Sequence, residues 1–453
     1  MSVYVNRSLN LKKIRAIGFD MDYTIVRYHT NEFEKFAYYA ILEKMVTDLN
    51  YPNEILKLKY APELTLQGLV IDKKHGNILK LSRYGQVKNS FHGVHRIDFK
   101  DQQKIYKRRV VDLNDPTIQS LDTAFSISNG VLYAQLVQLK KEGIIQLGHD
   151  ALADDIKETI DVVHRDGTLK TEVKNNISKY IIQDPDLPPL LEKYKDYGKK
   201  LLVITNSDYA YCKLLLDYTI TPFLKKYKNW SEVFELVITS AAKPVFFNSP
   251  QAFLKVDTDT GSLQNFNGAI TNGVYQGGNA GKLQNDLALD GDEILYLGDH
   301  IYGDVVALKK TFNWRTALVL NELDEEVKNI KKATKVQQLL DENMQSKESL
   351  ELDLNNLFTQ EHELNQKVGK NEISEIFDKI EKKNSEAGHF IDQYNDCFNH
   401  NWGELMRAGQ EESRFADQVE KYACIYMSKI SDLLEFSPRT YFRPLKRWMP
   451  HEL

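Results

Sequence analysis

Five short apolar runs, each followed by polar residues or glycine, constrain the fold of this chain more than any other feature. Each has the length of a strand and is rich in β-branched or aromatic residues: 14–19, 201–205, 236–240, 294–298 and 316–320. Because the runs are continuously apolar and do not alternate, we expect parallel strands that are covered on both faces. After the first run, apolar residues recur at helical spacing from Phe33 to Val46, until Pro52 ends the pattern. Repetition of a strand and a crossover helix predicts an α/β fold with a doubly wound parallel sheet, whose ligands lie at the carboxyl ends of the strands.

The other segments predict additions to this core. Segments that contain the apolar runs are assigned to the core itself: 1–110, 191–247 and 282–320. Residues 111–190 have a mainly helical pattern, and residues 248–281 are rich in Gly, Asn, Asp and Thr, so we expect both to form a cap over the core. Residues 321–453 combine high charge density with apolar residues at helical spacing, which predicts a helical C-terminal region that packs on the core.

Composition narrows the class of protein. The chain has 453 residues, 42% of them hydrophobic, so it can bury the cores of two or three domains without disulfides. Its 59 basic and 64 acidic side chains argue against nucleic acid as a partner. The cysteines lie far apart and are expected to be free thiols in a reducing compartment: Cys212, Cys397 and Cys424. The first residues contain no apolar leader, and no run approaches the ~20 apolar residues of a membrane span, so we expect a soluble, cytoplasmic protein without membrane contacts.

Four of the apolar runs lead into side chains that could carry chemistry. The strings that follow or end them are FDMDYT, TNSD, AAKPVFF and GDHIYGD. They supply Asp20 and Asp22, then Thr205, Asn206 and Ser207, then Lys243, and last Asp299 and Asp304. Taken singly, each has an ordinary explanation, because Asp, Ser and Thr are common in turns and helix caps and a lysine is usually solvated. At four strand ends of one sheet, the combination is far more specific than its parts.

Four carboxylates that converge at one sheet edge require a positive counter-charge. Each close pair would be repulsive by up to about 4 kcal/mol at an effective dielectric constant of about 20. The candidate ligands are all oxygen atoms, with no His or Cys among them, which favours a hard cation, and Mg²⁺ is the usual one beside phosphate. We therefore expect Mg²⁺ as the cofactor, and together with Lys243 it could neutralise an incoming phosphate group.

The four strings, in this order, resemble the motifs of the haloacid dehalogenase-like (HAD) phosphohydrolases. Longer strings are similar to a narrower family, the cytosolic purine 5′-nucleotidases that prefer IMP and GMP: FDMDYTI, NSDY, KPVFF, YLGDHIYGD and the terminal WMPHEL. The similarity covers the chain from about residue 11 to residue 453 and is patchy between about 321 and 400. The resemblance implies a HAD-like core and hydrolysis of a phosphate monoester.

The resemblance also implies a role for each motif residue. Asp20 would be the nucleophile that forms an aspartyl phosphate, and Asp22 the acid and base of the two half-reactions. Phosphoryl oxygens would be bound by Thr205, Asn206 and Ser207, and Lys243 would stabilise charge on the transferred group. Mg²⁺ would be held by the Asp20 side chain, the Asp22 backbone carbonyl and Asp299. Asp304 would orient waters or Lys243.

The signal for nucleoside recognition is weaker. The stretch DVVHRDGTLK resembles the segment in which this family contacts the nucleoside, and this implies contacts from Lys157, Asp161, His164 and Lys170. Phe125 lies where the family stacks the purine ring. The structural alternatives are a solvated helix face for the first set and a core position for Phe125. Asp122 stands where the family has an asparagine at an effector pocket, which puts an allosteric nucleotide site in doubt.

The expected function is Mg²⁺-dependent hydrolysis of purine nucleoside 5′-monophosphates, IMP and GMP first. A phosphatase for sugar phosphates or other small esters would share every core residue and differ only in the cap. Phosphotransfer to a nucleoside would use the same aspartyl phosphate. A noncatalytic nucleotide-binding module is the alternative outside enzymes, although no motif position has lost its reactive group. Family members are commonly oligomers, so a homo-oligomer is expected.

Overall fold

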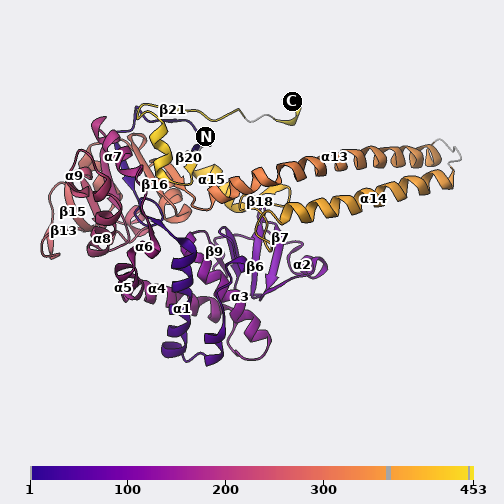
Figure 1. The fold of residues 1–453 in the computed structure, drawn as a ribbon, viewed down its shortest axis with the longest axis horizontal. Coiled ribbons are helices and arrows are strands. Elements are labelled where there is room, and N and C mark those ends of the chain that lie inside the picture. Colours follow the sequence, from indigo (N-terminus) through magenta and orange to yellow (C-terminus); the bar gives the residue numbers. More distant parts are fainter. Residues whose placement is uncertain (1–2, 364–368, 447–448, 453) are drawn as a thin grey trace. The chain divides into compact units, whose positions relative to one another are not determined.

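The largest element of the fold is a ten-stranded sheet. The computed structural model (Figure 1) describes residues 3–363, 369–446 and 449–452. The strand order is β1-β20-β17-β16-β3-β11-β12-β15-β13-β14. The seven neighbouring strands from β20 to β15 are parallel, and β1 and β13 are antiparallel to their neighbours. All five predicted runs are strands of this sheet, which confirms the α/β fold. The bounds are β1 (Val3–Val5), β3 (Ala16–Phe19), β11 (Lys200–Ile204), β12 (Leu236–Thr239), β13 (Phe253–Val256), β14 (Leu263–Phe266), β15 (Gly273–Gly277), β16 (Ile294–Gly298), β17 (Arg315–Val319) and β20 (Ile425–Met427).

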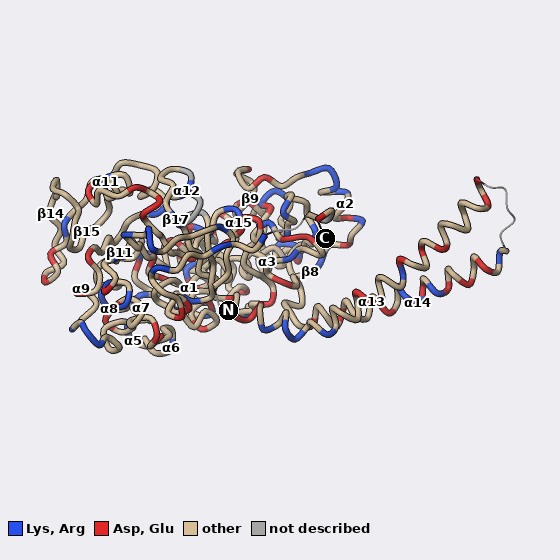
Figure 2. Tube along the Cα trace, turned by 90° about the horizontal axis from the view of Figure 1, so that it is seen from above, with Lys and Arg blue, Asp and Glu red and all other residues tan. Residues whose placement is uncertain are grey.

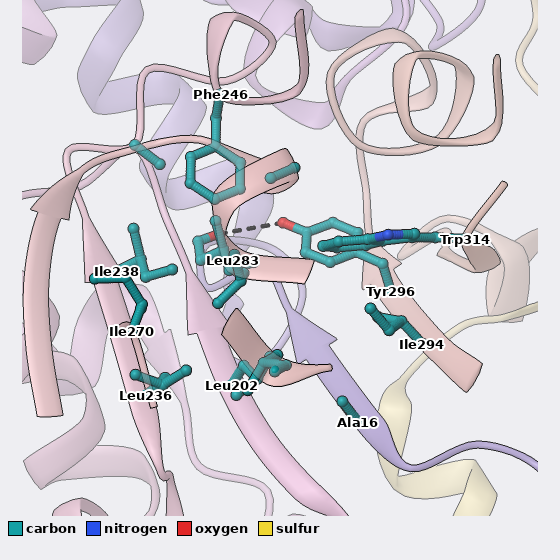
Figure 3. Packing of buried hydrophobic residues seen from close by; sticks show 14 of the residues in the cluster. Ala16, Leu202, Leu236, Ile238, Phe246, Ile270, Leu283, Ile294, Tyr296 and Trp314 are labelled. Atoms are coloured by element: carbon teal, nitrogen blue, oxygen red, sulfur yellow. Dashed lines mark hydrogen bonds between the residues drawn. The ribbon is translucent and has the colours of Figure 1, made fainter. Parts of the chain in front are cut away.

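Both faces of the parallel strands are buried, as their continuous apolar character predicts. On one face, alternate residues of β11, β12 and β16 pack with Trp314 and Phe246 (Figure 3). On the other face, the intervening residues of the same strands are also fully buried, for example Val203 and Leu297. Burial of one such side chain stabilises the fold by about 1.5–3 kcal/mol relative to its exposure to water. The sheet is therefore a rigid base for the residues that follow its strands.

Residues 30–180 form one large insertion between two short strands. The chain leaves the main sheet through β4 (Arg27–Tyr28) and returns through β10 (Ile181–Ile182), and these two strands pair antiparallel. The pairing continues into the insertion, where the His29 backbone N–H donates to the Tyr180 carbonyl at 2.8 Å. We call residues 30–180 the cap insertion. Its ends are thus joined at a single place, by a two-stranded ribbon.

The cap insertion contains a five-stranded antiparallel sheet, which the sequence analysis did not foresee. Its order is β8-β7-β6-β5-β9, with bounds β5 (Leu69–Asp72), β6 (Asn77–Leu81), β7 (Val87–His92), β8 (His95–Arg96) and β9 (Ile118–Leu121). Four of these strands lie in the segment 1–110, which the sequence predicts as part of the core. Of the residues of that segment that the structure describes, only β1 and β3 join the ten-stranded sheet. The hairpins turn at glycines with positive φ, Gly76, Gly85 and Gly93, a conformation that L-residues rarely adopt.

Helices complete the cap insertion. They are α1 (Thr30–Leu49), α2 (Phe99–Tyr106), α3 (Ile127–Lys141), α4 (His149–Arg165), α5 (Thr168–Asn175) and α6 (Ile177–Tyr180). α1 packs against both α3 and α4. Four of the six lie in the segment 111–190, where the pattern is mainly helical.

The segment 248–281 differs from the irregular cap excursion that its composition suggested. It forms β13, β14 and β15, which extend the main sheet beyond β12. Its Gly, Asn, Asp and Thr residues supply the turns between these short strands, for example the turn at Gly261, which has positive φ. The composition of this segment therefore indicated its turns but did not indicate its strands.

The C-terminal region belongs to two compact units of the chain. Asp324–Glu404 form a separate compact unit that contains the helices α13 (Leu323–His362) and α14 (Lys370–Asn395). Acidic and basic residues are interspersed along both helices (Figure 2). From Leu405 the chain belongs again to the first unit, where α15 (Arg414–Tyr422) precedes β20. The helical character of the region is as predicted, but β20 was not foreseen.

Two expectations about the whole chain can be compared with the structure. Cys212, Cys397 and Cys424 are free thiols, as expected. Among the described residues, no helix has both the length and the apolar character that crossing a membrane requires.

The buried side chain of Glu34 in α1 generates a prediction about pH and stability. Its carboxylate accepts from the Ser128 backbone N–H at 2.8 Å, yet burial raises its pKa from 4.5 to about 7. Because the folded state then binds more protons than the unfolded state, the free energy of unfolding should fall as pH rises from about 4.5 to about 7. Glu34→Gln removes this cost, so at pH 8 it should be more stable than the wild type by up to about 3 kcal/mol.

Urea unfolding at pH 5.5 and pH 8 measures this difference. The matched control is Glu43→Gln, an exposed position on the same helix, which should show no gain at pH 8. A stability difference between Glu34→Gln and the wild type that is the same at both pH values would contradict the prediction.

Candidate active site

The four motifs meet at the carboxyl edge of four adjacent parallel strands. β16, β3, β11 and β12 are neighbours in this order, and each motif begins where its strand ends. The strand register brings Leu297 beside Phe19 and Phe19 beside Val203, so the residues that follow emerge side by side. Motifs that lie far apart in the sequence therefore meet at one edge of the sheet.

The ammonium group of Lys243 is the centre of this site. Its Nζ lies 2.7 Å from Asp20 Oδ1 and 2.8 Å from Asp304 Oδ1, and it donates to the Tyr296 hydroxyl at 3.1 Å. Only 6% of the Lys243 side chain is exposed. Burial lowers the pKa of Lys243, but Asp20 and Asp304 outweigh this effect and hold the pKa well above its ordinary value. Lys243 is therefore a permanently charged group in a poorly solvated pocket.

Asn206 fixes the backbone of Lys243. Its side-chain Oδ1 accepts from the Lys243 backbone N–H at 2.6 Å, and its Nδ2 donates to the Lys243 carbonyl at 3.1 Å. Thr205 Oγ1 accepts from the Ser207 backbone N–H at 3.0 Å. These contacts give Asn206 and Thr205 positioning roles, and their predicted contacts with phosphate oxygens stay predictions.

Three buried carboxylates gather beside Lys243. Asp20, Asp299 and Asp304 each offer an oxygen, and these oxygens lie within 4.8 Å of one another. Burial raises the pKa of Asp20 to about 7 despite the opposing effect of Lys243, and burial with the nearby Asp20 raises the pKa of Asp299 well above its usual range. The carboxylates are thus costly to ionise together unless a cation lies among them. An all-oxygen, buried donor set of this kind fits a hard divalent cation.

Gly298 makes room for this arrangement. A Cβ atom at this position would lie 2.4 Å from Asp304 Oδ2, which is far inside van der Waals contact. Asp304 Oδ2 also accepts from the His300 backbone N–H at 3.2 Å, so its carboxylate is held close over the end of β16. The first glycine of the GDHIYGD string is therefore required for steric reasons.

Asp22 lies outside this carboxylate group. Its Oδ1 accepts from the Tyr28 hydroxyl at 2.5 Å, and its Oδ2 accepts from Ser207 Oγ at 2.7 Å. Burial raises its pKa, and the two hydrogen bonds partly oppose the rise. Ser207, predicted to contact phosphate, is here a partner of Asp22. Sequence reasoning missed Tyr28 and Tyr296, because nothing in the sequence distinguishes them from the chain's other tyrosines.

The predicted nucleoside-contacting residues are brought together only in part. A cavity of about 450 Å³ in the cap insertion is lined by Phe125 and Lys157, together with Lys73, Ser120 and Asn129. The Phe125 ring also meets the His164 ring edge-to-face, with 5.6 Å between centroids. Burial lowers the pKa of His164 to about 4, so this imidazole is neutral at pH 7.

Two further predicted residues lie apart from the cavity. Asp161 is exposed on α4, and Lys170 forms an ion pair with Asp208 at the N-cap of α8 (Tyr209–Thr219). Phe125 itself packs edge-to-face against Tyr23, with 4.5 Å between centroids. It is therefore both a core contact and a cavity wall. Asp122 stands where the resemblance places an asparagine of an effector pocket. Its Oδ1 lies 3.7 Å from His300 Nε2.

Comparison with known proteins identifies the family of this chain. The model of the 5′ nucleotidase family matches residues 3–453. A 5′-nucleotidase domain-containing protein of Dictyostelium discoideum is 26% identical over 457 residues, which cover 99% of this chain and 74% of that protein. Two solved structures align with 68% of this chain: a predicted phosphoglycolate phosphatase from Haemophilus somnus (85% of that chain, 13% identity, TM-score 0.30) and a HAD phosphatase from Thermococcus onnurineus (87%, 14%, 0.27). Because the family model spans nearly the whole chain, this protein belongs to the 5′ nucleotidase family and is a phosphoric monoester hydrolase.

Proposed function

We propose that this enzyme hydrolyses purine nucleoside 5′-monophosphates, with IMP and GMP preferred, through an aspartyl phosphate and with Mg²⁺ as cofactor. The observation that supports this most strongly is that the carboxylates of Asp20 and Asp22 have different partners. Asp20 contacts Lys243 Nζ at 2.7 Å, while Asp22 is held apart by Tyr28 and Ser207. One carboxylate is thus beside the positive charge that a phosphate dianion needs, and the other is free of that cluster and available for proton transfer.

These positions support a reaction in two halves. Asp20 attacks phosphorus while Asp22 gives its proton to the departing 5′ oxygen, which releases the nucleoside. Asp22, now a carboxylate, removes a proton from water, and the resulting hydroxide displaces phosphate from Asp20. Burial raises the pKa of Asp22, which favours the protonated form that the first step requires. Lys243 offsets the charge of the transferred group in both steps.

The charge balance of the site favours a divalent cation. Asp20, Asp299 and Asp304, when ionised, bring three negative charges, and Lys243 brings one positive charge. The remainder of two negative charges equals the charge of Mg²⁺ with opposite sign. The side chains of Asp20 and Asp299 and the backbone carbonyl of Asp22 would hold the ion, which would screen the nucleophile from the incoming phosphate.

The proposed preference for purines rests on the cap insertion. The cavity lined by Phe125 and Lys157 combines an aromatic wall with a cation and with polar side chains. Asn129 Oδ1 is buried and lacks a hydrogen-bond partner. It could therefore accept a hydrogen bond from a ligand. The neutral His164, which is not part of the cavity lining, packs edge-to-face against Phe125 and supports that aromatic wall. A sugar phosphate would use the same core but would leave these aromatic surfaces unoccupied.

The nucleophile assignment predicts the outcome of one conservative change. Asp20→Asn keeps the shape of the side chain but removes the nucleophile, so release of phosphate from IMP should fall by at least about 10³-fold while the protein stays folded. The control is Asp292→Asn, an exposed position just before β16, which should keep full activity. Undiminished turnover by Asp20→Asn would remove this residue from the mechanism.

The substrate assignment is tested with the wild type. Initial rates on IMP, GMP, AMP and a sugar phosphate should rank with the purine nucleotides first, and a clear preference for the sugar ester would refute the purine proposal. Added inosine distinguishes phosphotransfer, because a new nucleotide would form from it.

The metal assignment predicts opposite effects of Asp299→Asn with and without the ion. In EDTA the variant should be more stable than the wild type, by on the order of 1 kcal/mol, because one of three crowded buried carboxylates is gone. With Mg²⁺ at a hundredfold excess over Kd, the wild type should gain about 2.7 kcal/mol, and the variant little or nothing. Thermal unfolding in EDTA and in Mg²⁺ measures both effects, and an equal gain in the two proteins would contradict the assignment.

A further inference from the structure

We propose that Tyr28 is a positioning residue for the acid–base step, whose hydroxyl holds the Asp22 carboxyl group in place between the core and the cap insertion. This inference rests on the proposed function, because it takes Asp22 as the group that moves the proton. It concerns a residue that lies outside the four motifs.

The hydroxyl of Tyr28 occupies one defined position. Tyr28 is 5% exposed, and its ring is stacked on Tyr23 with 4.7 Å between centroids. Phe33 meets the same ring edge-to-face at 5.0 Å. These two aromatic contacts hold the ring in place, and its hydroxyl lies 2.5 Å from Asp22 Oδ1. With Ser207 on Oδ2 at 2.7 Å, both oxygens of the carboxyl group are fixed.

The two partners of Asp22 come from different parts of the fold. Ser207 follows β11 of the main sheet, whereas Tyr28 belongs to β4, the outgoing strand of the ribbon that carries the cap insertion. Within the ribbon, Tyr28 is paired with Ile181 of β10. The orientation of Asp22 therefore depends on the ribbon as well as on the sheet.

A second hydroxyl extends this contact. Tyr211 Oη on α8 lies 3.2 Å from Tyr28 Oη, and either atom can be the donor. While Asp22 is a carboxylate, Tyr28 donates to it. When Asp22 carries the proton to be transferred, that proton must face the departing oxygen, and a lone pair of Oδ1 can still accept from Tyr28, while Tyr211 can donate to the Tyr28 oxygen. Tyr28 can thus stay hydrogen-bonded to Asp22 on both sides of the proton transfer, which avoids an unpaired polar group at this site.

Leaving groups of different basicity separate positioning of the acid from general damage to the fold. The departing 5′ oxygen of a nucleotide needs a proton, whereas p-nitrophenolate leaves without one. In single-turnover reactions, which isolate the first transfer step, Tyr28→Phe should slow nucleoside release from IMP by about 10–100-fold. Release of p-nitrophenolate from p-nitrophenyl phosphate should change by less than about threefold, and KM for IMP should stay unchanged.

Tyr106→Phe is the matched control. Tyr106 is also 5% exposed, and its hydroxyl also donates to a buried carboxylate, Asp72 Oδ2, at 2.9 Å. It lies at the end of α2 in the cap insertion, so its loss removes an equivalent hydrogen bond away from Asp22. Both esters should react with the control as with the wild type. Comparable melting temperatures of the two variants would establish that the folds are equally intact.

The outcomes distinguish this inference from the function on which it rests. If the wild type hydrolyses neither ester, or Asp20→Asn still hydrolyses both, the proposed function fails. If the wild type acts on both esters and Tyr28→Phe slows them equally, or slows neither, the positioning role is overturned while the proposed function stands.

Discussion

The site depends on one buried ammonium group. Lys243 holds Asp20 and Asp304 together across adjacent strands, and its own backbone is fixed by Asn206. Removal of one partner from such a cluster leaves an uncompensated buried charge, which typically costs 3–5 kcal/mol. Because three carboxylates surround a single lysine, the cluster is not self-sufficient, and its excess negative charge creates the demand for a cation. Repulsion among these carboxylates thus makes the folded state less stable at the site where phosphate chemistry requires several charged groups.

The sheet explains why such a cluster can form at all. Its four central strands are apolar on both faces and end at the same edge, so residues nearly 300 positions apart, such as Asp20 and Asp304, emerge beside one another. The hydrophobic core fixes the strands, and the strands fix the carboxylates before any ligand arrives. The reactive groups need no rearrangement of the backbone to meet.

Much of this core could be predicted from the sequence, because continuous apolar runs and the groups that follow them are local signals. The antiparallel sheet of the cap insertion was missed, although its glycine turns, such as that at Gly76, were visible. Two of its strands, β5 and β6, are buried on both faces, so their pattern resembles that of core strands. Hydrogen-bond partners were harder still. The roles of Tyr28 toward Asp22 and of Asn206 toward Lys243 depend on packing between distant segments, which spacing along the chain does not encode.

The ribbon of β4 and β10 has a consequence for how this protein could have been assembled. Because His29 and Tyr180 are joined by a backbone hydrogen bond at 2.8 Å, the intervening chain begins and ends at one point of the scaffold. Closing even a long loop there adds little entropy cost, since that cost grows only with the logarithm of loop length. Recombination could therefore replace the whole cap insertion by another segment without changing the strands of the main sheet. The same phosphate chemistry would then act on different substrates.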